Sequence, residues 1–133
     1  MLTNVLESEM MRCDGAGTDS LNVAPVDFKH LRRYTLGDAK LEREVLDLFL
    51  MQLPETIRAL GSAHSEKDWR VAAHTIKGSA RAVGAWRIAR LAEHAERHLS
   101  VQNPGHCAEA VARIEEATDE ARQFIRASYP QAC

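Results

Sequence analysis

The strongest constraint on the fold of this 133-residue chain is the spacing of its apolar residues. Four long segments carry an apolar residue every three or four positions, which is the period of an amphipathic helix, and a shorter segment with the same period precedes them. The predicted helices cover residues 25–36, 38–60, 66–83, 85–99 and 106–127. Short connections force successive helices to run in opposite directions. The sequence therefore predicts an all-α fold, an antiparallel four-helix bundle with a short N-terminal lid helix.

Capping residues support these boundaries. Asp38 is a favourable N-cap for the first long helix, and Ser65 with Asp68 forms a start that is similar to a capping box. Gly84 is expected to supply the C-terminal turn of the helix over residues 66–83. Pro54 is expected to kink the helix that contains it, because proline lacks a backbone N–H.

The N-terminal segment and the cysteines indicate where the bundle begins and in which compartment the protein is expected. Residues 1–24 show no sustained period and predict a flexible N-terminal tail, which leaves 25–133 for the bundle. Cys13, Cys107 and Cys133 are an odd number at wide separations, so they predict a reduced, cytoplasmic protein rather than a disulfide framework. The start of the chain lacks the features of a secretory signal.

Charge and motifs exclude several functions. The formal net charge of -2 gives no global basic field for nucleic acid, and the most apolar stretch, residues 45–53, is far shorter than the ~20 residues that cross a bilayer. The chain contains no G-x-G-x-x-G fingerprint before a helix, no Walker lysine loop and no H-E-x-x-H pattern. We therefore expect no nucleic-acid, membrane or nucleotide binding.

His74 is placed unusually for a helical histidine. At ~100° per residue, with His74 at zero, Ala72, Ile76 and Val83 fall within ~20° of the opposite side of the helix. The residues that flank this apolar pole are Trp69, Ser79 and Ala80. Because the apolar face must be buried, His74 is expected to face solvent.

The surroundings of His74 suggest phosphoryl chemistry. Gly78, one turn along, is unfavourable inside a helix by ~1 kcal/mol relative to alanine, and it would leave space for a partner to approach the imidazole. Arg81 lies on the same side, with Lys77 on one flank and Arg70 on the other. The charges of Lys77 and Arg81 would favour a neutral imidazole and attract a phosphoryl group. The alternative is that these residues form an ordinary solvated face.

Residues 73–80 read Ala-His-Thr-Ile-Lys-Gly-Ser-Ala and are followed by glycine and alanine at 84–85. This stretch resembles the A-H-x-L-K-G-S-x motif of histidine phosphotransfer (HPt) domains, with Ile76 in place of the commoner leucine. The resemblance is strongest over residues 69–96, and helix order and length extend it over about 25–127.

The resemblance implies a phosphorelay intermediate with no ATP site and no kinase activity of its own. His74 would accept a phosphoryl group from a receiver-domain aspartate and pass it to another receiver, with Lys77 as the stabilising cation and Gly78 as the clearance for the incoming domain. Arg70, Lys77, Gly78 and Arg81 would contact that partner. The partners would be receiver domains of response regulators and hybrid histidine kinases, which would bring their own magnesium, so no cofactor of this chain is expected. We also expect a free-standing unit that is monomeric.

Three other interpretations are less well supported by the sequence. His94 and His98 have the spacing of two ligands to one metal, with Glu93 adjacent, but no other helix offers a matching Glu-x-x-His, so no metal site is predicted. A non-catalytic helical adaptor could use the basic face around His74 without accepting phosphate. A divergent HPt relative could bind receivers without transfer, although the presence of both His74 and Lys77 argues against it.

Overall fold

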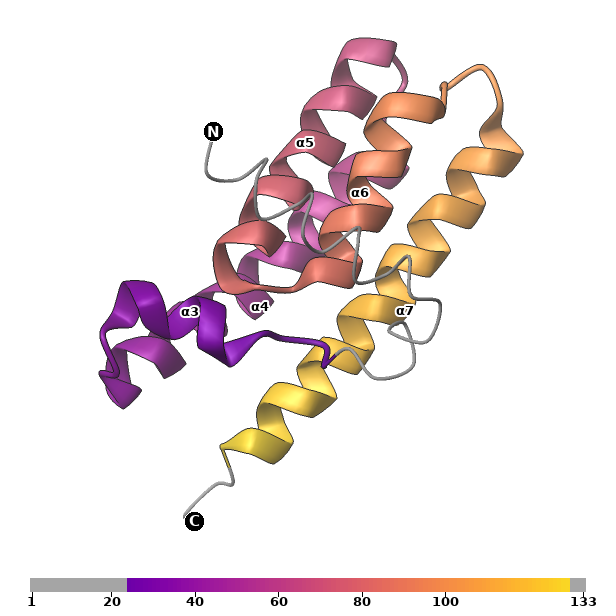
Figure 1. Cartoon of the computed structure of the whole chain (residues 1–133). Helices are drawn as coiled ribbons and strands as arrows, with labels where there is room; N and C mark the ends of the chain where they lie inside the picture. The colour runs from indigo at the N-terminus through magenta and orange to yellow at the C-terminus, as the bar shows by residue number, and fades with distance from the viewer. Residues whose placement is uncertain (1–23, 130–133) are drawn as a thin grey trace, which may run out of the picture.

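The computed structural model describes residues 24–129, and these form five helices and no strand (Figure 1). The all-α prediction is therefore confirmed. The tail predicted over residues 1–24 lies outside the described residues apart from Ala24. None of the helices in this described range has the length and apolar character needed to cross a membrane. The helices are α3 (Phe28–Thr35), α4 (Ala39–Gly61), α5 (Glu66–Val83), α6 (Trp86–His98) and α7 (Pro104–Ser128).

Helix α3 begins three residues later than the sequence predicted, at Phe28 rather than Pro25. The reason is Asp27, whose side-chain oxygen accepts a hydrogen bond from the backbone N–H of His30 at 3.1 Å and so caps the helix. The backbone N–H of Asp27 donates instead to the carbonyl of Gly84, at 2.9 Å. A tertiary contact therefore fixes the start of this helix.

The caps of the long helices agree with the sequence. The side chain of Asp38 accepts from the N–H of Leu41 at 3.0 Å, and Ser65 accepts from the N–H of Asp68 at 3.0 Å. Helix α4 continues through Pro54 to Gly61. Helix α7 starts earlier than predicted, at Pro104, because proline fits the first helical turn, where no intrahelical N–H bond is lost.

Each of the four long helices packs on two other long helices. Helix α4 contacts α5 and α7, helix α6 contacts the same two, and α3 lies against α4 and α5 (Figure 1). The indole of Trp69, which is 1% exposed, donates to the backbone carbonyl of Ala95 at 2.8 Å and joins α5 to α6 inside the core. The largest fully buried side chains are Trp69, Leu31, Leu46, Leu60, Ile76, Ile88, Ile114 and Val26.

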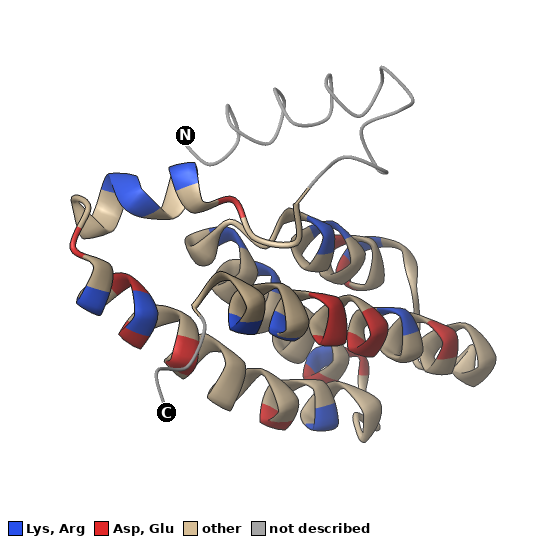
Figure 2. Ribbon diagram, turned by 90° about the horizontal axis from the view of Figure 1, so that it is seen from below, with Lys and Arg blue, Asp and Glu red and all other residues tan. Residues whose placement is uncertain are grey.

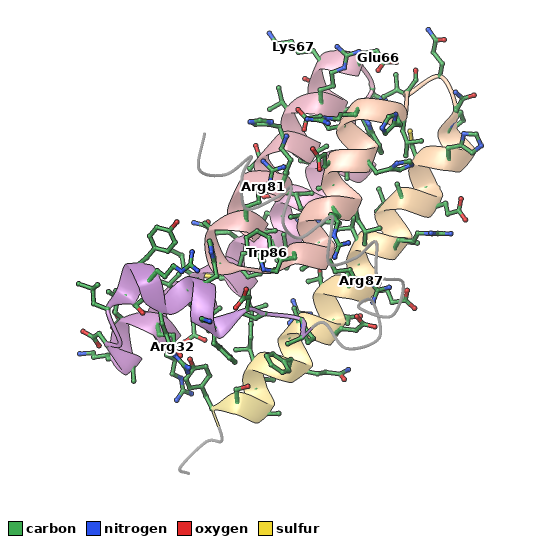
Figure 3. The ribbon with its side chains drawn as sticks, viewed as in Figure 1. Arg32, Glu66, Lys67, Arg81, Trp86 and Arg87 are labelled. Carbon is green, nitrogen blue, oxygen red and sulfur yellow. The ribbon has the colours of Figure 1, made fainter. Side chains whose placement is uncertain are left out.

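The turn between α5 and α6 also anchors the segment before α3. Gly84 has a φ of +81°, and a Cβ built on it would lie 2.8 Å from the backbone oxygen of Asp27. The indole of Trp86 donates to the second carboxylate oxygen of Asp27 at 3.0 Å. Figure 3 shows Trp86 near the middle of the molecule, between Arg32 of α3 and the far end of α5 that carries Glu66 and Lys67.

A buried carboxylate holds α3 onto the bundle. Glu42 on α4 is 2% exposed and accepts hydrogen bonds from Arg32 of α3, at 2.8 Å for the Nε, and from the hydroxyl of Tyr129 beyond α7. Burial acts to raise the pKa of Glu42, but the hydrogen bonds from Arg32 and Tyr129 and the Arg32 charge outweigh it, and the pKa lies below its usual value. Burial of Tyr129 itself, with the hydrogen bond to Glu42 and the negative charge of Glu42, raises the pKa of Tyr129 to about 12, because all three disfavour the phenolate.

We predict that Gly84→Ala destabilises the fold by about 1–3 kcal/mol, because alanine disfavours positive φ and its methyl would collide with Asp27. Gly78→Ala is the matched control: a Cβ there meets nothing within 4 Å, and the residue lies inside a helix, so stability should rise by about 0.5–1 kcal/mol. Urea denaturation of both variants measures the difference. Equal effects of the two substitutions would contradict this account of the turn.

We also predict a pH dependence from Glu42. Because its folded pKa is lowered, its stabilising contribution is complete above the unfolded pKa of about 4.3 and is lost as pH falls through the folded value. Glu42→Gln should therefore lower the free energy of unfolding by about 1–3 kcal/mol at pH 7, with the difference from the parent shrinking below about pH 4. Denaturation of both proteins from pH 3 to 7 tests this, and a pH-independent difference would refute it.

Candidate functional site

His74 faces solvent from α5, as the sequence predicted. Its side chain is 66% exposed, whereas Ala72, Ile76 and Val83 on the opposite side of the helix are buried. Ser79, which the helical pattern placed beside the buried face, is exposed. The backbone that carries the imidazole is therefore held rigidly by the core, while the ring itself stays accessible.

The imidazole is held by a carboxylate that the sequence analysis did not single out. The Nδ1 atom of His74 lies 3.0 Å from the Oε2 of Glu96 on α6. The other oxygen of Glu96, Oε1, lies 2.8 Å from the Nζ of Lys77. One carboxylate thus joins the histidine and the lysine of the motif.

Lys77 is not on the exposed flank where the helical pattern placed it. It is 8% exposed, and its ammonium group forms the ion pair with Glu96. The physical reason is that α6 packs against this side of α5, so that the aliphatic stem of Lys77 lies between the helices and its charge requires a partner there.

Glu96 is a charged acceptor at neutral pH. Burial acts to raise the pKa of its carboxyl group, but the contacts with Lys77 and His74 outweigh burial and hold the pKa below its usual value. An ionised carboxylate accepts hydrogen bonds and cannot donate them. The Nδ1 of His74 therefore carries the ring proton, and in the neutral imidazole the Nε2 keeps its lone pair.

The basic surface predicted around His74 is partly neutralised. Arg81 is paired with Glu93 on α6, with 3.5 Å between Nη2 and Oε2, and Figure 3 shows it projecting between α5 and α6. Arg97 pairs with the same carboxylate at 3.2 Å. Arg70 is exposed. Glu93 thus offsets part of the positive charge where α6 meets α5.

Gly78 is exposed and has open space beside it, since an added Cβ would meet nothing within 4 Å. No packing contact in the described structure therefore accounts for a glycine at this helical position. The lack of a side chain leaves the surface next to His74 open.

The two histidines of α6 lie next to each other, as two ligands of one metal ion would. The rings of His94 and His98 have their centroids 5.1 Å apart. Within residues 24–129, no three histidine, cysteine, aspartate or glutamate side chains are placed to share a metal ion.

Exposed apolar side chains gather on one part of the described chain. The large exposed apolar side chains come from α3, from the turn after it, and from α4 and α5. Among the described residues, α6 and α7 contribute none. They are Tyr34, Leu36, Leu41, Leu48, Met51 and Val71, which we call the apolar patch. On α5, Val71 and Gly78 lie on the side of His74 away from Lys77 and α6, and therefore toward α4.

Comparison with known proteins adds a family match. A family model described as the Hpt domain matches residues 44–124, which is more than half of the chain. The match includes all of α5 and α6, hence His74, Lys77 and Glu96, but it leaves α3 and Leu36 outside. Neither the curated proteins nor the solved structures give a match to this chain.

We predict that Glu96 fixes the tautomer of His74. The ¹⁵N spectrum of the parent at high pH should show a protonated Nδ1 and an unprotonated Nε2, and Glu96→Gln should mix the two tautomers, because an amide both donates and accepts. Glu96→Gln should also lower stability by about 2 kcal/mol, since Lys77 stays buried without a counter-charge.

Lys77→Met is the matched variant for this experiment. It removes the ammonium but leaves the Glu96–His74 contact, so the Nδ1-protonated tautomer should persist, and adding it to Glu96→Gln should recover part of the lost stability. A parent protein with an unprotonated Nδ1 would show that the carboxylate does not select the tautomer.

Proposed function

This chain belongs to the Hpt domain family, whose members have a phosphotransfer role in phosphorelays, and from that premise we propose that His74 is the residue that carries the phosphoryl group. His74 would take the group from a receiver-domain aspartate and deliver it to another receiver. The observation that carries this proposal is an exposed imidazole whose Nδ1 is held by Glu96 while Nε2 is free.

The geometry supports attack by Nε2. Its lone pair would form a bond to the phosphorus of the aspartyl phosphate, and the bond from phosphorus to the aspartyl oxygen would break, which releases the carboxylate. The ring, which keeps its proton on Nδ1, then carries a positive charge 3.0 Å from the Glu96 oxygen. A charge that develops during transfer is stabilised by a group already fixed in place. Return of the phosphoryl group reverses these steps.

Lys77 has a supporting role in this proposal. Its ammonium lies 2.8 Å from Glu96, so it offsets the negative charge that would otherwise repel an incoming phosphoryl group. The sequence-based role of Lys77 as a direct contact to the phosphoryl group stays a prediction. No cofactor of this chain is required, since magnesium is expected on the receiver.

The docking surface for the receiver would be the apolar patch together with the open surface at Gly78. Figure 2 shows the Lys and Arg positions of α3 in blue along the ribbon, and this helix contains Lys29, Arg32 and Arg33 but no acidic residue. An acidic receiver pocket would complement this basic rim, and Arg70 and Arg81 would extend it beside His74. Apolar contacts within a charged rim are typical of transient interfaces.

We also infer the finer organisation that the family implies. Residues 25–133 would form an antiparallel four-helix bundle of α4 to α7, with α3 as its lid; the pairwise packing of these helices and their short connections support this. We propose a monomer that acts in the cytoplasm and has no kinase activity of its own.

The test is transfer of labelled phosphate from a panel of phosphorylated receiver domains to the full chain. We predict acid-labile, base-stable label on the parent and its loss in His74→Ala. His94→Ala is the matched control, because it removes another exposed histidine and should keep the label.

The opposite result is as informative. If no receiver from the host of this protein labels the folded parent, or if label persists in His74→Ala, the phosphorelay proposal is wrong. Binding of a receiver without label would then favour a non-catalytic adaptor.

A further inference from the structure

Leu36 combines two unfavourable features. It has φ 54° and ψ 34°, in the left-handed region, and it is the one non-glycine residue with positive φ among the residues described. Its side chain is also 87% exposed, the highest fraction in the apolar patch. A large apolar residue in this position is strained by its backbone and gains nothing from burial.

The turn itself does not require leucine. Leu36 caps α3 by donating its N–H to the carbonyl of Arg32 at 2.9 Å, a backbone contact that any residue except proline can make. Gly37 follows with φ 80°, and the N–H of Asp38 donates to the carbonyl of Thr35 at 3.0 Å. Glycine or asparagine is the residue that normally occupies such a C-terminal position. Folding alone therefore favours replacement of Leu36.

Two other members of the apolar patch flank Leu36 in the chain. Tyr34, 65% exposed, precedes it on α3, and Leu41, 41% exposed, follows it on α4. The hydrogen bonds that Arg32 and Tyr129 donate to Glu42 hold this end of α3 in place. Leu36 also lies outside residues 44–124, which are the residues that match the family model.

We propose that Leu36 is a specificity-determining anchor, which inserts into an apolar depression on the receiver domain when the receiver docks over His74. This inference rests on the proposed function. A receiver is the occupant that the surface favours, because the apolar patch reaches Val71, one turn before His74 on α5, and because α3, which leads into Leu36, carries three basic residues and no acidic residue to complement an acidic pocket. Strain retained at an exposed position is typical of sites where binding, rather than folding, selects the residue.

The test separates stability from docking by three substitutions at this position in the full chain. Leu36→Gly should raise Tm by roughly 4 °C, because it relieves the backbone strain, yet raise the half-saturating receiver concentration for phosphotransfer about tenfold. Leu36→Ala keeps the strain and should raise that concentration equally without the gain in Tm. Leu36→Met should restore docking to near the parent value. The probe is the receiver domain that labels the parent fastest, and the maximal transfer rate should change little in all three variants.

Three outcomes would contradict the proposed function or the role of Leu36, and the measurements distinguish them. If the parent chain takes no label at His74, the proposed function fails, and this inference fails with it. If the parent is labelled but Leu36→Gly and Leu36→Ala keep the parent half-saturating concentration, the function stands and Leu36 is not an anchor. If Leu36→Gly lowers Tm, Leu36 has a structural role, and the inference is overturned whatever the transfer assay shows.

Discussion

The turn at Gly84 is the constraint on which most of this structure depends. Its positive φ lets α5 end and α6 begin almost immediately, so the two helices pack along their length. The missing side chain also leaves room for Asp27, whose backbone bonds to Gly84 and whose carboxylate accepts from Trp86. One residue therefore determines the register that brings α6 to His74 and the anchor point of α3.

Two glutamates play parallel parts at different places in the molecule. Glu42 joins α4 to α3 and to the residue beyond α7, and Glu96 joins α6 to two residues of α5. Glu42 is buried and Glu96 is partly buried, and both keep a lowered pKa because their partners outweigh the effect of burial. The first stabilises the position of the proposed docking surface, and the second stabilises the orientation of the imidazole. The fold and the site thus use the same physical device, a carboxylate shared by two donors.

The sequence predicted the features that depend on one helix at a time. The existence of the helices, the caps at Asp38 and Ser65 and the outward direction of His74 all follow from local spacing. The burial of Lys77 and the role of Glu96 could not follow from it, because each depends on a neighbouring helix. One feature of the sequence beyond local spacing could have indicated Glu96. His74 and Glu96 are each eleven positions from Ala85, so a tight turn at Ala85 places the two residues at the same height on neighbouring helices. The start of α3 was likewise fixed by a distant residue, Gly84.

The distribution of exposed apolar residues has a consequence for how such a protein can diverge. The apolar patch comes from residues 34–71, whereas the carboxylate that holds the His74 imidazole comes from α6. Substitutions in the first region would alter the proposed docking surface and leave the imidazole and its carboxylate untouched. After duplication, copies of this chain can therefore drift toward separate signalling circuits while their chemistry stays the same.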